Sequence, residues 1–67
     1  MNTETIKIKK AARSILRVDP SDLSRSEFSK LKSSARRVID MLESVDDAEF
    51  CEEMLDMLSN LKEVVRG

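Results

Sequence analysis

The sequence predicts an all-α protein: a small helical bundle in which an N-terminal helix precedes a long antiparallel helical hairpin, within a single domain of residues 1–67. Three observations lead to this fold class. The 67 residues include one Pro and one Gly, and the Gly is the last residue. Because glycine supplies the positive-φ positions of tight hairpin turns, a β-rich fold would lack the residues that its turns require. Apolar residues also recur at helical spacing, and two complete helix-start signals occur.

The first helix is expected at residues 3–18, where apolar residues recur at steps of three and four. They are Ile8, Ala11, Ala12, Ile15 and Leu16. Residues 5–9 alternate like a strand, and a strand before two helices would resemble the ribbon–helix–helix DNA-binding proteins, which are strand-paired dimers. No capping residue separates Ile8 from Ala12, so a helix is favoured, while helix, strand and disorder stay open for residues 3–9.

Two further helices are expected at residues 25–44 and 47–66. Each begins with the same signature: an apolar residue, a capping Ser or Asp, a Glu three residues later and then a Phe. In such a capping box the Ser or Asp accepts from the backbone of the third helical residue, whose Glu side chain reaches back to the cap. The apolar residue before the cap packs against the Phe as a hydrophobic staple. The two copies run from Leu23 to Phe28 and from Val45 to Phe50.

Both of these segments are amphipathic. Apolar residues continue in steps of three and four, and the third helix is apolar over about half of its circumference, which is wide enough to touch two neighbours. The rows are Phe28, Leu31, Ala35, Val38, Leu42 and Val45, and then Cys51, Met54, Leu58, Leu61 and Val65. Pro20 breaks the chain ahead of them, because the residue before a proline is driven out of α geometry. Only about two residues are expected between the two helices, which must therefore fold back as an antiparallel hairpin.

A chain of this length has little core of its own. A domain of about 60 residues buries only about 60% of the surface that its unfolded chain exposes. The single Cys and the absence of His exclude a disulfide framework and a zinc site. We therefore expect a homodimer with a four-helix core built from two hairpins. The corner at residues 42–47, with Cys51 behind it, resembles that of the plasmid repressor-of-primer proteins, which are dimeric helical hairpins that bind paired RNA loops. This resemblance serves as an architectural analogue only.

Composition also limits the classes of function. Without His there is no imidazole base to activate a nucleophile, and without internal Gly there is no phosphate-cradling loop. We expect no enzymatic activity, no cofactor, no bound metal and no small-molecule substrate. No apolar run exceeds two residues, so neither a membrane span nor a signal peptide is expected. We therefore expect a cytoplasmic location.

Charge is distributed unevenly along the chain. Residues 1–37 hold ten Lys and Arg against four Asp and Glu, whereas residues 38–67 hold two against nine, which gives the net charge of −1. One interpretation is internal: the acidic third helix neutralises the basic first half. The alternative is a small nucleic-acid-binding regulator whose cationic rows meet phosphates, although the chain has no Tyr, Trp or His for base stacking. Its candidate residues are Lys7, Lys10, Arg13, Arg17, Arg25, Lys32, Arg36 and Arg37.

The favoured function is a non-enzymatic regulatory or adaptor protein that contacts another protein through its helices. The candidate partner-binding surface is an apolar stripe with charged flanks on the first helix. It consists of Ile8, Ala12, Ile15 and Leu16, flanked by Arg13 and Arg17. Met41, Met54 and Met57 are expected to fill gaps in the core, with a compliant partner-binding surface as the alternative. Glu49, Glu52, Glu53 and Asp56 are expected on the solvated back of the third helix.

Overall fold

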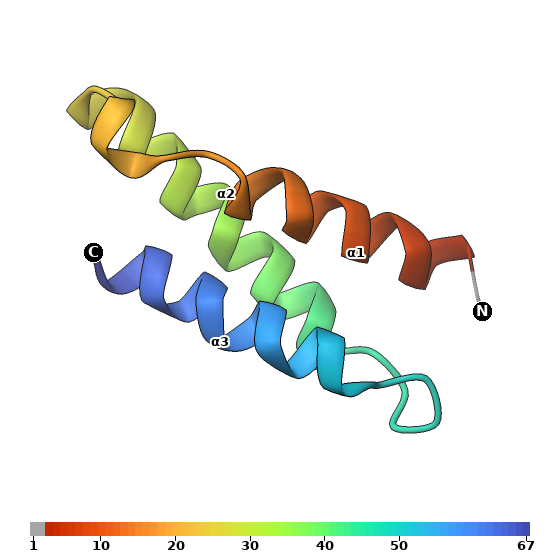
Figure 1. The fold of residues 1–67 in the computed structure, drawn as a ribbon. Helices are drawn as coiled ribbons and strands as arrows, with labels where there is room; N and C mark the ends of the chain where they lie inside the picture. Colours follow the sequence, from red (N-terminus) through yellow and green to blue (C-terminus); the bar gives the residue numbers. More distant parts are fainter. Residues whose placement is uncertain (1–2) are drawn as a thin grey trace.

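A computed structural model describes residues 3–67, and these residues form a three-helix bundle (Figure 1). The elements in chain order are α1 (Thr3–Leu16), a short 3₁₀ helix η1 (Pro20–Asp22), α2 (Arg25–Glu43) and α3 (Glu52–Arg66). The predicted all-α bundle is confirmed, and the described residues contain no strand, so the first segment is helical from Thr3 onward. α1 and α3 run in the same direction and α2 runs opposite to both (Figure 1).

The start of α2 is formed as the sequence predicts. The backbone N–H of Glu27 donates to Ser24 Oγ at 3.2 Å, and the backbone N–H of Ser24 donates to Glu27 Oε1 at 3.0 Å. This reciprocal pair is a complete capping box. The hydrogen bonds from the backbone and side chain of Ser24 hold the pKa of the Glu27 carboxyl below its ordinary value, because they favour the charged form. The capping box fixes where α2 begins.

The predicted start of the third helix at residue 47 is wrong, since α3 begins at Glu52. Residues 44–51 form a longer loop, in which the carbonyl of Asp46 accepts from the backbone N–H groups of Glu49 and Phe50 at 2.9 and 3.0 Å. The Glu49 carboxylate accepts from Thr5 Oγ1 of α1 at 2.7 Å and does not complete a capping box. A tertiary hydrogen bond thus uses the side chain that the local signal required. Cys51 caps α3 without a side-chain hydrogen bond.

The core lies between the three helices. Its largest fully buried side chains, Leu42, Met54 and Leu61, come from α2 and α3. Ala12 and Ala35 are also fully buried. Their small side chains are suited to close approach of the helices that carry them, and the remaining buried apolar residues are Ile15, Val38, Ile39 and Met57.

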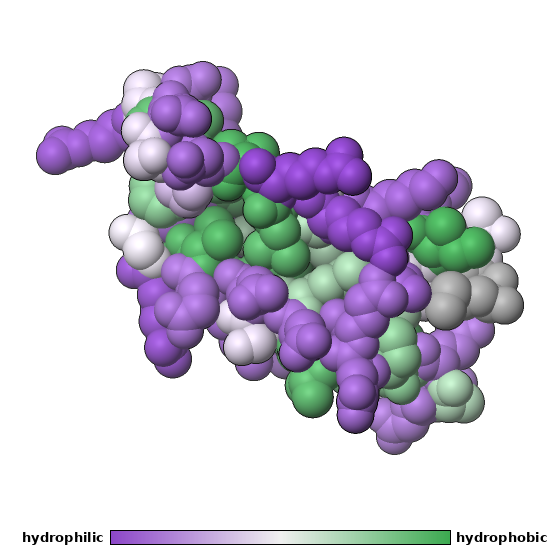
Figure 2. Space-filling view, viewed as in Figure 1, coloured by the Kyte–Doolittle hydropathy of each residue, from purple (hydrophilic) through white to green (hydrophobic). Residues whose placement is uncertain are grey.

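The core is not covered evenly. α1 has 14 residues against 19 in α2, so it spans only part of the hairpin. Figure 2 shows apolar atoms gathered in a hollow between α3 and the end of α1, with polar atoms around it. Four large apolar side chains of the described residues are exposed: Ile6, Val18, Met41 and Leu55.

Replacing Ser24 by Ala is expected to destabilise the protein. The change removes the side-chain acceptor of the capping box, and losses of this kind cost about 1 kcal/mol of the free energy of unfolding. For a domain of this size that corresponds to a fall in Tm of about 4–8 °C. Thermal unfolding followed by circular dichroism measures it, with Ser26→Ala as the control, because Ser26 is exposed in the same helical turn. Equal Tm values for the two variants would contradict the assigned start of α2.

Candidate functional site

A groove of about 810 Å³ lies between α1, the end of α2 and the loop that follows α2. Its apolar lining comes from Ile8 and Ala11 of α1, Met41 of α2 and Val45 of the loop. Polar side chains complete it: Glu4, Thr5, Lys7, Asp40, Ser44, Asp46 and Glu49. Its apolar floor within a charged rim is the arrangement usual in sites that bind an apolar side chain.

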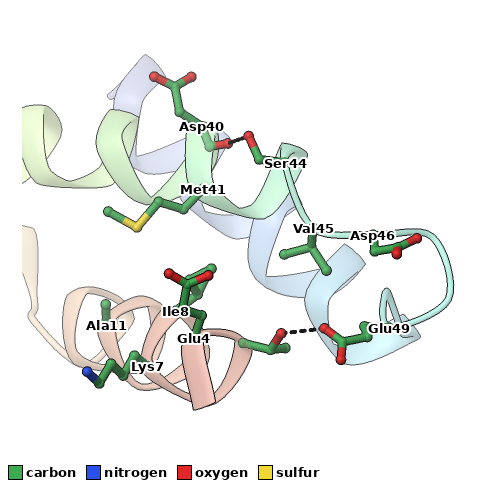
Figure 3. A pocket seen from close by; sticks show the side chains of 11 residues that line it. Glu4, Lys7, Ile8, Ala11, Asp40, Met41, Ser44, Val45, Asp46 and Glu49 are labelled. Atoms are coloured by element: carbon green, nitrogen blue, oxygen red, sulfur yellow. Dashed lines mark hydrogen bonds between the residues drawn. The ribbon is translucent and has the colours of Figure 1, made fainter. Parts of the chain in front are cut away.

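The side chains of the groove differ in direction (Figure 3). Met41 points from α2 toward Ile8 and Ala11, and 40% of this residue is exposed. The Glu4 carboxylate extends from α1 toward α2, into the space between the helices, whereas the Asp40 carboxylate points away from α1. The Asp46 carboxylate also points away from α1 and accepts from the Ala48 N–H of its own loop, so Glu4 and Glu49 are the acidic residues whose carboxylates face the space between α1 and the rest of the lining.

The wall of the groove that α1 provides is held in place by polar contacts with the loop and α3. Thr5 Oγ1 donates to Glu49 Oε2 at 2.7 Å, and Lys9 Nζ lies 3.4 Å from Glu53 Oε2. Arg13 Nη2 also pairs with Glu53 Oε1. Thr5 and Lys9 are four residues apart, as are Glu49 and Glu53, so the contacts follow one another along α1 on one side and along the end of the loop and the start of α3 on the other. We call this set of five residues the polar ladder.

The polar ladder changes the acidity of Glu53. The hydrogen bond from Arg13 is the main cause that lowers the pKa of the Glu53 carboxyl; loss of hydration raises it by less, and the charges of Arg13 and Lys9 add smaller decreases. The expectation that Glu49 and Glu53 lie on a solvated back of the third helix is therefore wrong. Both carboxylates face α1, and Lys9 and Thr5, their partners, are buried.

The predicted partner-binding stripe of α1 lies mostly against the hairpin. Ala12 is fully buried and Ile15 is 9% exposed, so the chain itself covers both. Leu16 and Ile8 are half-buried, and of the stripe only Ile8 lines the groove. Of the flanking cations, Arg13 belongs to the polar ladder and Arg17 is exposed just beyond the end of α1.

The candidate nucleic-acid residues are spread over α1 and α2. Lys10, Arg17, Arg25, Arg36 and Arg37 are exposed, and Lys7 lines the groove. Lys32 is half-buried, with its Nζ 5.0 Å from the centre of the Phe28 ring, a cation–π contact. Lys9 and Arg13 pair with Glu53, so part of the basic first half is neutralised internally.

Sequence reasoning did not place Met41, Val45, Thr5 or Glu49 together. Met41 was expected in the core like Met54 and Met57, which are indeed buried. The sequence did contain one signal for these contacts, the matched spacing within the polar ladder. Thr5 and Lys9 interrupt the apolar face of α1 four residues apart, and Glu49 and Glu53 are also four residues apart. Residues four apart share one face of a helix, so such a match allows the two segments to pair side by side, in either relative direction.

The fold and the groove together define a small three-helix bundle with an acidic, apolar-floored groove. No family model, curated protein or solved structure matches the chain. No helix in residues 3–67 combines the length and the apolar character that crossing a membrane requires. Within the same residues no three His, Cys, Asp or Glu side chains converge as metal ligands would.

Lowering the pH is expected to weaken the docking of α1 through Glu53. Its pKa is lower in the folded chain than its ordinary value of 4.5, so its contribution to stability is present above that value and is lost as the pH falls through the folded pKa. The Tm of the natural chain should therefore fall more steeply with acidification than that of Glu53→Gln, with the difference reduced by added salt. Thermal unfolding at a series of pH values measures both. Glu63→Gln, which removes an exposed carboxylate outside the polar ladder, is the control, and parallel curves for all three chains would refute the assignment.

Proposed function

We propose that the chain is a non-enzymatic small regulatory or adaptor protein that acts through helix-mediated contact with another protein, and that the groove beside Met41 is its docking site. The observation that carries this proposal is an exposed Met above an apolar floor formed by two helices and a loop. The stripe on α1 supports the proposal only through Ile8, because Ala12 and Ile15 are already covered.

The physical case rests on what docking would remove from water. Met41 is 40% exposed, and burying apolar surface contributes about 25 cal/mol per Å². Methionine has an unbranched, polarisable side chain that adapts to partners of different shape. A partner helix would present apolar anchors at successive turns to a groove that is bounded by helices on two sides. Affinity would come from these few anchors, with the charged rim setting orientation.

Self-association remains a part of the proposal. The expected homodimer needs an apolar face outside the three-helix core, and Leu55 of α3, which is 56% exposed, offers one that is separate from the groove. The hollow in Figure 2 offers another. Sedimentation at micromolar concentration distinguishes a monomer of 7.6 kDa from a dimer.

A selection from a library of random helical peptides is expected to yield binders that depend on Met41. Met41→Gln keeps the length and the neutrality of the side chain but removes its apolar character. It should therefore lower the affinity for the selected peptides by about tenfold, or about 1.4 kcal/mol of binding free energy. Leu55→Gln makes the same kind of change at an exposed apolar residue outside the groove and should leave binding unchanged. Fluorescence anisotropy with the selected peptides measures both.

Two results would contradict the docking site. Peptides that bind both Gln variants equally well would place the contact elsewhere, and a selection that enriches no binder would remove the proposal of a helix-docking groove. Both substituted side chains are exposed, so the free energy of unfolding should change by less than about 0.5 kcal/mol and folding should not confound the comparison.

Nucleic-acid binding is a second candidate function. Among the described residues, the exposed cations Lys10, Arg17, Arg36 and Arg37 have no ion-pair partner. Cations of this kind release counterions when they meet a phosphate backbone. The net charge of −1 and the acidic end of the molecule oppose this function, since they would repel the same backbone.

A gel shift with RNA and DNA fragments tests the second candidate. If about six to ten phosphates are neutralised, affinity should fall by orders of magnitude between about 50 and 200 mM salt. Arg36→Gln combined with Arg37→Gln should weaken any such binding, whereas Met41→Gln should not. The absence of a shift at low salt with either nucleic acid would remove this candidate.

A further inference from the structure

The groove lies at the most acidic part of the chain. Residues 40–53 contain seven Asp and Glu and no Lys or Arg. Three of these carboxylate-bearing residues, Asp40, Asp46 and Glu49, line the groove, and Glu4 adds a carboxylate from the opposite wall. Among residues 3–67, Lys7 is the one cation in the lining. The groove therefore combines an apolar floor with a negatively charged rim.

The backbone of α2 adds to this negative potential. The C-terminal end of a helix carries a partial negative charge from carbonyl groups that have no partner further along the helix. α2 ends at Glu43, beside the groove, and its last turn contains no basic residue that would offset this charge. The carbonyl of Asp40 accepts from the backbone N–H of Ser44 at 3.2 Å and from Ser44 Oγ at 3.0 Å. The helix end and the carboxylates act on a ligand in the same sense.

We propose that the occupant of the groove is a cationic peptide segment of another protein, rich in Lys or Arg, with a bulky aliphatic side chain that packs beside Met41. This inference rests on the proposed function of the groove and specifies the chemistry of the partner. The aliphatic side chain would meet the floor of Ile8, Ala11 and Val45, while the flanking cations would meet the carboxylates of the rim.

A second copy of the chain fits the groove less well. In a two-fold dimer whose axis passes through the groove, the groove of one copy would bring its carboxylates against those of the other. Like charges in such a position repel, and among residues 3–67 only Lys7 in each lining would offset the four acidic residues there. A separate protein with a basic segment meets no such repulsion.

The test uses two synthetic amphipathic peptides of about 18 residues, long enough for about five helical turns. Both carry Leu at the same positions, and they differ only in having Lys or Glu on the polar face. The Lys peptide is expected to bind the full chain at least about tenfold more tightly than the Glu peptide at physiological salt, as measured by fluorescence anisotropy. Met41→Gln should lower the affinity for the Lys peptide, and Leu55→Gln should leave it unchanged.

A matched pair of double variants separates the rim from general attraction to an acidic protein. Glu4→Gln with Asp46→Asn removes two charges at the groove, and Asn retains the oxygen that accepts from the Ala48 N–H at 3.3 Å. Glu52→Gln with Asp56→Asn removes two charges of the same types from exposed positions of α3 outside the groove. The first double variant should lower the affinity for the Lys peptide by about tenfold, and the second should lower it by less than about twofold.

Each other outcome overturns the inference. Equal weakening by the two double variants would indicate non-specific attraction, and failure of both peptides to bind would show that charge and Leu anchors do not suffice. Binding of both peptides with equal affinity and loss of both in Met41→Gln would reject the cationic partner while keeping the docking groove. A dimer in sedimentation that Met41→Gln disrupts and Leu55→Gln does not would make a second copy the occupant.

Discussion

The polar ladder is the interaction on which the rest of the structure depends. Apolar burial supplies most of the energy of a fold but does little to fix the direction or register of a helix on a hairpin. Here Thr5 meets Glu49, and Lys9 with Arg13 meets Glu53, so α1 is set parallel to α3 at one register. In that register Ala12 and Ile15 cover the core, and the first half of α1 becomes one wall of the groove. Ion pairs as exposed as that of Arg13 are weak individually, so their main effect is to choose among arrangements.

The sequence predicts the features of the fold that depend on neighbouring residues. The capping box of Ser24 and Glu27 forms as expected because both partners lie within one turn of α2. The same signature at Asp46 does not form a capping box: the Asp46 carboxylate accepts from the Ala48 N–H at 3.3 Å, and the Glu49 carboxylate accepts from the Thr5 hydroxyl of α1, which is 44 positions away in the sequence. A local pattern cannot include this distant partner. The loop of residues 44–51 stands where the signature predicted the start of a helix, and part of it lines the groove.

The groove itself was beyond prediction from periodicity for a related reason. Met41, Met54 and Met57 all lie on or beside an apolar row, and each is chemically suited to a core or to a partner surface. Packing separates them: Met54 and Met57 lie within the bundle, whereas Met41 stands at the edge where α1 crosses the end of α2. Whether a residue at the border of an apolar row is covered depends on the position of the neighbouring helix. That position is decided by contacts between distant parts of the chain.

Glu49 links the docking of α1 to the groove, because it belongs both to the polar ladder and to the lining of the groove. A ligand that contacts α1 and α2 together can bind only while α1 is docked, so it stabilises the docked state by mass action. Conversely, a change that lowers the docked fraction of α1 lowers the apparent affinity in proportion to that fraction, because only the docked state presents both walls of the groove. A cationic ligand would also relieve the mutual repulsion of the carboxylates that residues 40–53 bring together at this end. The acidity that opposes stability in the free chain is thus the same property that would favour a basic partner.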